Sequence, residues 1–377
     1  MTSPLLVRTI DPATHRAFLA ASAASGRSAS FLQTPGWGAV KQEWRAESVG
    51  WYDGDQLVGA GLVLYRQLPR VKRYLAYLPE GPVLVWEGEL QPLLQPLADH
   101  LRRSGAFAIR MGPPVISRRW SANQVKEGIA DSTIQRLGQQ PPSARTQEGA
   151  AVLSQLREAG WLFQGAEGGF AAGQPQFNFV IPLEGRSEAD VLAGMNQLWR
   201  RNIKKAAKLG VEVSLGGPAD LAAFHELYAH TAQRDHFTPR PLSYFEKMFA
   251  ALDDPAAGTE IRLYLAHHEG DLVASTIWIR SGRHVWYSYG ASSTEKREVR
   301  GSNAIQWRMI QDALAAGADV YDLRGITETL DAEDSHVGLI QFKVGTGGEA
   351  VEYVGEWDLP LKPLLYKGFQ LYMNRRA

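Results

Sequence analysis

Residues 51–60, WYDGDQLVGA, contain a pattern that returns at residues 263–275, LYLAHHEGDLVAS. In both copies a tight turn around a glycine, Gly54 or Gly270, separates two apolar runs, which is typical of a β-hairpin. Each hairpin is followed by a helical segment that ends at a glycine, and then by a short apolar strand. Two segments in the same order predict the duplication of one α/β unit. A chance recurrence is the alternative, because hairpin, helix and strand are common neighbours.

The length of the chain indicates two domains. Its 377 residues, 45% of them hydrophobic, are too many for one typical domain and enough for two that each bury a core. Between the two copies, residues 138–149, GQQPPSARTQEG, have the composition of a surface loop. We therefore expect an α/β (α+β) protein whose first domain covers residues 1–164 and whose second covers residues 165–354. A helical segment within residues 355–377 is expected to pack back on the first domain.

The composition excludes several kinds of protein. The chain has no cysteine, which rules out disulfides, a thiol nucleophile and any cysteine-containing zinc site. Basic and acidic residues both number 40, so the formal net charge is +0, whereas a protein that coats duplex DNA is usually basic. No stretch approaches the ~20 apolar residues of a membrane span, and residues 1–8 lack the order of a secretory signal. The expected location is the cytoplasm, with any nucleic-acid contact limited to a local patch.

One helical segment supplies such a patch. Residues 198–210, LWRRNIKKAAKLG, place five cations within nine residues and contain no acid. On a helix, one stripe and its flank carry Arg200, Arg201, Lys204, Lys205 and Lys208. A local field of this kind suits phosphate contacts to an RNA end. A solvated helix face is an equally good interpretation, since no base-reading motif accompanies the cations.

Two further segments could carry chemistry. A Thr-Pro helix start puts Trp37 and Lys41 one turn apart on one face. Arg240, just before a proline, could present a planar fork to a carboxylate or phosphate, and Tyr244 lies a turn further on. The plainer alternatives are a buried tryptophan beside a solvated lysine, and an arginine in a capping loop.

Two aromatic segments follow in the second half. Strand alternation within residues 285–293 puts Tyr287 and Tyr289 on one face. Within residues 338–348, Phe342 and Lys343 stand among glycines, where a lysine could reach a ligand, although most loop lysines are simply exposed. The histidines lack the spacing of a metal site, and no nucleotide-binding loop is present. No metal is therefore expected.

The order of these motifs along the chain resembles that of the FemABX family of aminoacyltransferases. The resemblance runs from about residue 31 to 360 and rests on FLQ at 31–33, RNIKKA at 201–206, RPL at 240–242, YSYGAS at 287–292, YDLRG at 321–325, QFK at 341–343 and GEAVEY at 348–353. It implies two acetyltransferase-like (GNAT) domains in tandem, facing each other across a cleft, in agreement with the predicted duplication. The single short basic helix is more similar to the compact FemX form than to the FemA form with its coiled-coil arm.

The resemblance also implies a substrate site. Lys41 and Arg240 match positions that grip the phosphates of a nucleotide-linked cell-wall precursor. The remaining residues expected to bind substrate are Tyr244, Tyr287, Tyr289 and Trp37.

The implied activity is transfer of an amino acid from aminoacyl-tRNA to an amine on the stem peptide of a UDP-linked or lipid-linked peptidoglycan precursor. Phe342 and Lys343 match an aromatic-lysine pair near the charged tRNA end, where Lys343 would stabilise the oxyanion or the leaving ribose hydroxyl. The tRNA ester is already activated, so no cofactor is implied, and any association with a membrane would be peripheral. Gly112, before Pro113, departs from the acidic residue usual in the family, so a carboxylate at that position cannot be the base.

Two other functions remain open from the sequence. An acyl-CoA-dependent N-acyltransferase would share the fold, and fold does not fix function. Residues 297–304, REVRGSNA, lack the glycine spacing with which such enzymes bind pyrophosphate, which disfavours this alternative. The second is a binding protein that kept the cleft and lost the chemistry, which Gly112 would fit.

Overall fold

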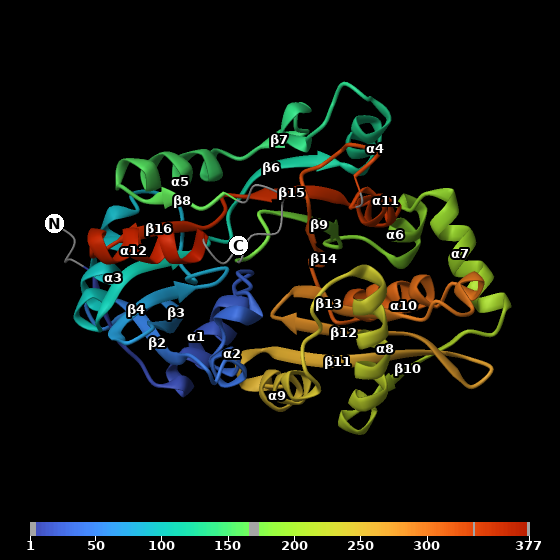
Figure 1. Ribbon diagram of the computed structural model, residues 1–377, viewed down its shortest axis with the longest axis horizontal. Helices are drawn as coiled ribbons and strands as arrows, with labels where there is room; N and C mark the ends of the chain where they lie inside the picture. Colours follow the sequence, from blue (N-terminus) through green and yellow to red (C-terminus); the bar gives the residue numbers. More distant parts are fainter. Residues whose placement is uncertain (1–4, 166–172, 335, 375–377) are drawn as a thin grey trace.

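The duplicated pattern forms the same arrangement twice in the computed structural model, which describes residues 5–165, 173–334 and 336–374. Figure 1 shows two mixed sheets side by side, the first on the left and the second towards the right. Within the described residues the first sheet has seven strands, in the order β1 (Leu6–Thr9), β2 (Arg45–Asp53), β3 (Gln56–Leu68), β4 (Val71–Leu78), β5 (Ala106–Met111), β16 (Trp357–Pro360) and β8 (Leu162–Phe163). The second has nine described strands, in the order β10 (Glu212–Gly216), β11 (Thr259–His268), β12 (Asp271–Ser281), β13 (His284–Ser292), β14 (Val320–Ile326), β9 (Phe177–Pro182), β15 (Glu349–Tyr353), β6 (Ile116–Ser121) and β7 (Ala144–Arg145).

The two copies share one order of elements. Strands β1 to β5 correspond to β10 to β14, because in each set the first four strands pair antiparallel and the fourth pairs parallel with the fifth. Two helices follow the first strand of each set, which are α1 (Pro12–Ala24) and α2 (Pro35–Val40) in the first unit, and α8 (Leu221–Asp235) and α9 (Leu242–Leu252) in the second. The parallel crossover runs through α3 (Gln91–Arg103) or α10 (Gly301–Ala315). The predicted duplication is confirmed.

The chain passes between the two sheets several times. After β5 it enters the second sheet with β6, α4 (Ala122–Ala130) and β7, then returns to the first with α5 (Gln147–Glu158) and β8. Near its end, β15 belongs to the second sheet and β16 to the first. The sequence predicts an unbroken first domain over residues 1–164, whereas β6 and β7 pair in the second sheet. The residues of a short strand carry no signal of the sheet in which it pairs. Residues 166–172, next to that boundary, lie outside the described part of the chain.

One apolar cluster joins the two units. Trp37 of α2 and Leu62 of β3 pack in the same cluster as Phe245 of α9 and Ile277 of β12. Helices α2 and α9 come so close that a Cβ at Gly36 would lie 2.2 Å from the carbonyl oxygen of Ala251. Glycine is therefore required at this contact, and the contact fixes α2 against the second unit.

The remaining helices surround the second sheet or return to the first. Their bounds are α6 (Glu188–Gly194), α7 (Gln197–Lys208), α11 (Val337–Val344) and α12 (Pro363–Asn374), with short 3₁₀ turns η1 (Phe31–Gln33), η2 (Leu137–Gln139), η3 (Pro218–Asp220), η4 (Pro255–Ala257) and η5 (Arg297–Val299). Helix α12 packs on the first sheet, where the ring centroids of Phe369 and Phe107 are 5.5 Å apart. Residues 375–377 of the expected C-terminal helix lie outside the described residues.

Candidate active site

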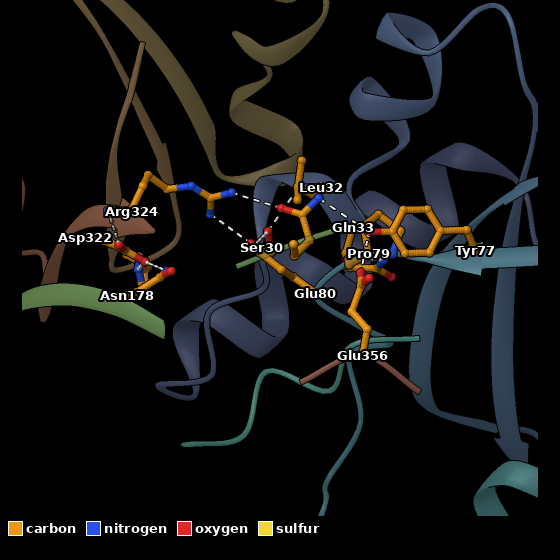
Figure 2. A network of polar contacts seen from close by, with 12 residues as sticks. Ser30, Leu32, Gln33, Tyr77, Pro79, Glu80, Asn178, Asp322, Arg324 and Glu356 are labelled. Carbon is orange, nitrogen blue, oxygen red and sulfur yellow. Dashed lines mark hydrogen bonds and ion pairs between the residues drawn. The ribbon is translucent and has the colours of Figure 1, made fainter. Parts of the chain in front are cut away.

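A polar network joins the units at the end of β14. The guanidinium of Arg324 donates from Nη1 to Glu80 Oε1 at 2.8 Å and from Nη2 to Gln174 Oε1 at 3.0 Å. Ser30 Oγ donates to the other oxygen of Glu80 at 2.6 Å, and Figure 2 shows these side chains converging between the two units. The side chains of Arg324 and Glu80 are 19% and 18% exposed, so this ion pair is largely shielded from water.

The strained backbone at Arg324 helps to position Lys343. Its φ of 63° is left-handed, which costs a non-glycine residue about 1–3 kcal/mol. Asp322 offsets part of this cost, because its Oδ1 accepts a hydrogen bond from the Arg324 N–H at 2.6 Å. The carbonyls of Arg324 and Gly325 then accept hydrogen bonds from Lys343 Nζ at 3.2 and 2.7 Å. The irregular strand thus holds the lysine in place.

Lys343 is buried, unlike most lysines that stand among glycines. It lies in the last turn of α11 and is 3% exposed, so the simple alternative of an exposed loop lysine is wrong. Burial lowers its pKa to about 7, against the charge of Asp322, which raises it, while Arg324 lowers it further. A lysine with this pKa can both hold and release a proton near neutral pH.

Phe342 lines a pocket next to the first turn of α10. Its ring lies 4.8 Å from that of Trp199, whose Nε1–H donates to the Phe342 carbonyl at 2.9 Å. The pocket has a volume of about 530 Å³ and also contacts Asn202 of α7. The positive end of a helix attracts anions, and Arg297, Arg300, Ser302 and Asn303 lie around it. Lys296 also lines the pocket but is paired with Glu269 and Asp271, at 3.0 and 2.7 Å, and Glu295 adds one acid to the lining. The pocket therefore suits an anionic ligand with a planar or apolar end.

Helix α7 carries the predicted basic patch beside this pocket. Trp199 and Asn202 face the pocket, while the exposed side of the helix carries Arg201, Lys204, Lys205 and Lys208. Within the described residues these four cations have no carboxylate partner. Arg200 differs, since its Nη1 donates to the carbonyls of Ala193, at 3.0 Å, and Met195, and so closes the end of α6.

The second predicted group of residues meets around Tyr244. Lys41 Nζ and Arg240 Cζ lie 5.3 and 5.4 Å from the centre of its ring, one cation from each unit. Lys41 also lies 5.5 Å from the ring of Trp37, and Tyr289 donates from its hydroxyl to that of Tyr244 at 3.3 Å. Burial lowers the pKa of Lys41, which Glu43 raises and Arg240 lowers again. Glu43 Oε1 lies 3.7 Å from Lys41 Nζ, whereas Arg240 has no carboxylate partner within the described residues. The two cations therefore leave a net positive charge that suits an anion.

Tyr287 and Tyr289 do not share a strand face as strict alternation predicts. Tyr289 pairs with Ile277 and Tyr287 with Trp278, because a bulge inserts one residue of β13 between them. Tyr289 therefore faces the cluster that joins the units, whereas Tyr287 packs in the core of the second unit. Only Tyr289 lies with Tyr244 and Lys41.

A cavity of about 420 Å³ lies between the sheets on the other side of η1. Six carboxylates line it: Glu80, Glu184, Asp319, Asp322, Glu349 and Glu356. Asn178 also lines it, and its Oδ1 is buried without a partner among the described residues. The lining does not include Lys41, Arg240 or Lys343. Arg119 and His284 also line the cavity, next to Glu349 and Asp322, while Glu80 and Asp319 pair with Arg324 and Arg283. Glu184 and Glu356 are the lining acids without an ion pair within the described residues, and with the free acceptor of Asn178 they suit a cationic ligand.

Glu356 occupies the space beside Gly112 in this cavity. A Cβ at Gly112 would lie 3.3 Å from Glu356 Cγ and 3.8 Å from its Oε1. Tyr77 donates to that oxygen at 2.5 Å, and burial raises the pKa of Glu356. A carboxylate is thus present at this position although the local sequence lacks one. No sequence pattern indicated Glu356. Gly112 follows β5 and Glu356 precedes β16, and the two residues come together only because these strands pair in the folded protein.

The three regions are connected through η1. The ring of Phe31 lies 5.5 Å from Trp37 and 6.0 Å from Arg324 Cζ, so it bridges the Lys41 site and the Arg324 junction. Ser30, its neighbour, lines the cavity. Lys343 lines neither space. Its Nζ is held by two carbonyls of β14, the strand that also places Asp322 in the cavity wall, and its neighbour Phe342 lines the pocket.

This arrangement defines a tandem N-acyltransferase-like protein. The fold is similar to the crystal structure of FemX, with a TM-score of 0.78 and 21% identity over 96% of this chain and 98% of that one. It is also similar to a tandem GNAT protein from the clavulanic acid biosynthesis pathway, with a TM-score of 0.53 and 12% identity over 95% of this chain and 98% of that one.

The chain belongs to the FemAB family, whose sequence model matches residues 11–266 and 258–374. Among its curated relatives is the UDP-N-acetylmuramoylpentapeptide-lysine N(6)-alanyltransferase of Weissella viridescens, 29% identical and covering 89% of this chain and 90% of the relative. The Lipid II:glycine glycyltransferase of Staphylococcus saprophyticus subsp. saprophyticus is 23% identical, covering 89% of both chains. The relatives are thus named as transferases, and the expected family and fold are confirmed.

Proposed function

We propose that this protein transfers an amino acid from aminoacyl-tRNA to an amine on the stem peptide of a peptidoglycan precursor. The observation that carries the proposal is the position of buried Lys343, beside the pocket of Phe342 and against the strand that lines the acidic cavity. The names of the alanyl- and glycyltransferase relatives support the class of reaction and of acceptor. Charged tRNA is a cytoplasmic donor, so we assign the reaction to the cytoplasm.

The donor would enter through the pocket at α10. The ring of Phe342 offers a surface on which the terminal adenine can stack, and the first turn of α10 with Arg297 and Arg300 can bind its phosphate. The four exposed cations of α7 extend from the same pocket and can follow the RNA backbone. These features together favour an RNA end over a small anion.

The acceptor would bind across both units. Lys41 and Arg240 would hold its diphosphate beside Tyr244. The acidic cavity, on the far side of η1, would take the ammonium group of the stem peptide, where Glu356 and the free Oδ1 of Asn178 can accept its protons. With the diphosphate held on one side of η1 and the stem peptide on the other, the position of the acceptor amine would be fixed.

The chemistry removes two protons from the acceptor nitrogen and adds one to the ribose oxygen. The ammonium loses a proton, for which Glu356 is the nearest suitable base, and the amine nitrogen then attacks the ester carbon. The tetrahedral oxyanion forms beside Lys343, whose charge stabilises it. The C–O bond to ribose breaks with transfer of a proton from Lys343 or water to the ribose oxygen, and the nitrogen returns its second proton to the same donor as the amide forms.

An acyl-CoA donor is the second candidate, because the pocket at the start of α10 could also hold a pyrophosphate. To distinguish the two donors, the protein is incubated with soluble precursor and either radiolabelled aminoacyl-tRNA or radiolabelled acetyl-CoA, and transfer of label to the precursor is measured. Transfer from charged tRNA alone is expected. Transfer from acetyl-CoA alone would overturn the proposal, and transfer from neither, with precursor binding intact, would identify a binding protein that lacks the reaction.

A further inference from the structure

Helix α12 presents large aliphatic side chains to solvent. Its inner side, Leu365, Tyr366, Phe369 and Met373, packs against the first sheet. On the opposite side Leu364 and Leu371 are 86% and 62% exposed and lie two turns apart on one stripe. Leucines this exposed bury little apolar surface within the described fold, so the stripe is available to a partner surface.

A strongly basic hairpin lies next to this helix. Leu68, at the end of β3, packs against the same cluster that α12 covers. The hairpin of β3 and β4 exposes Val71 together with four cations, namely Arg66 of β3, Arg70 of the turn, and Lys72 and Arg73 of β4. Lys362 and Lys367 of the α12 segment are also exposed, so the described surface carries six cations. Within the described residues none of them is paired with a carboxylate, and the sequence has no acid between Asp55 and Glu80 or after Asp358.

We infer that this surface, formed by the 66–73 hairpin and the outer side of α12, docks on an anionic lipid bilayer. Aliphatic side chains that enter the interface, surrounded by lysines and arginines, match a membrane of negative surface charge. A second copy of the chain would bring like charges together. RNA is also less suitable, since the exposed side chains at the centre are aliphatic and offer no stacking surface. Within the described residues no helix is long and apolar enough to cross a membrane, so the contact would be made from one side.

The docking surface lies close to the Lys41 site. Arg66 lies 5.9 Å from the ring of Trp44, which follows the Lys41 site by three residues. A bilayer at the hairpin would therefore lie next to the place where a diphosphate is expected to bind. Docking on the bilayer does not rest on the proposed function.

The test is co-sedimentation of the full chain with vesicles of phosphatidylglycerol and phosphatidylcholine, compared with phosphatidylcholine alone. We expect binding to the anionic vesicles only, weakened by salt. The variants Leu364→Ser/Leu371→Ser and Arg70→Glu/Lys72→Glu should each lose about tenfold or more in partition. Matched controls lie at the other end of the molecule in Figure 1, where Lys204→Glu/Lys208→Glu on α7 and Leu215→Ser on β10, 54% exposed, should bind as the wild type does.

Three results would overturn the inference. The first is an absence of vesicle binding, or an equal loss in the control variants. The second is a loss of RNA affinity in the hairpin variant with no effect of the leucine changes, which would assign the surface to nucleic acid. The third is a self-association that the leucine changes abolish, which would assign it to a second copy. Vesicle binding in a protein that transfers no amino acid would leave the docking surface standing and remove only the proposed function.

Discussion

Arg324 and Glu80 form an ion pair between the two units, with 2.8 Å between Nη1 and Oε1. Arg324 lies in the fifth strand of the second unit, two residues before its end, and Glu80 follows the fourth strand of the first. The same arginine supplies a backbone carbonyl to Lys343 Nζ. The contact that joins the units therefore also positions the buried lysine, and a change at this pair should affect both stability and turnover.

Removing one partner of this pair should destabilise the protein. We expect Arg324→Met or Glu80→Gln to lower the free energy of unfolding by about 3 kcal/mol, because the remaining partner stays shielded and unpaired. The double variant should lose less than the sum of the two single losses. Denaturant unfolding of the four proteins measures this coupling. Strictly additive losses would show that the two residues act independently.

Lys343 and Arg240 should fail in different ways. Lys343→Met is expected to leave binding of the nucleotide-linked precursor unchanged and to lower kcat by about 10²–10³. Arg240→Met should weaken precursor binding by about tenfold to a hundredfold, since it removes a charge-assisted contact to phosphate. Calorimetric titration and single-turnover transfer separate the two effects. Equal loss of binding in both variants would contradict these roles.

The depressed pKa of Lys343 predicts how stability varies with pH. Its pKa falls from 10.5 in the unfolded chain to about 7 in the folded protein. Between these values the unfolded chain holds a proton that the folded protein lacks, so this group makes the free energy of unfolding rise with pH. The slope reaches at most about 1.4 kcal/mol for each pH unit. Urea unfolding of the wild type at pH 7, 8 and 9 should show this rise relative to Lys343→Met, and parallel curves would mean that the lysine titrates normally.

The repeated hairpin made the fold predictable. Asp53-Gly54 and Glu269-Gly270 are local signals, and the helices and strands after them follow in the order that the structure shows. The passage of β6 and β7 into the second sheet was not predictable, because the residues of these short strands do not determine which distant strand they pair with. The same holds for Glu356, which reaches the space beside Gly112 from the other end of the chain.

The positions of individual side chains were also only partly predictable from the sequence. Lys41, Arg240 and Tyr244 meet as their order along the chain indicated. Tyr287 does not join them, since a one-residue bulge turns it to the other side of β13, and alternation cannot reveal a bulge. The burial of Lys343 was hidden for another reason: its glycine neighbours are typical of a loop, whereas its partners are carbonyls of a strand far away in the sequence.

Glu356 should be needed for deprotonation of the acceptor. We expect Glu356→Gln to lower kcat/KM for the acceptor by about 10²–10⁴, the usual contribution of a general base. Tyr77→Phe is the matched control, because it removes the hydrogen bond to Glu356 and keeps the carboxylate. Transfer rates should recover partly at high pH in the glutamine variant, where more of the acceptor amine is already neutral. A fully active Glu356→Gln protein would assign the base elsewhere.

The exposed cations of α7 should determine how tightly charged tRNA binds. Each phosphate contact releases condensed counterions, so removing one cation that makes such a contact lowers the slope of log affinity against log salt by about one. Lys204→Gln/Lys208→Gln should therefore lower the slope by about two and raise KM for the donor, with KM for the precursor unchanged. Lys126→Gln, on α4, supplies a control cation outside the α7 stripe and should leave both quantities as they are. An unchanged slope in the double variant would mean that this side of α7 is merely solvated, and the donor would then have to be held by the pocket at α10 alone.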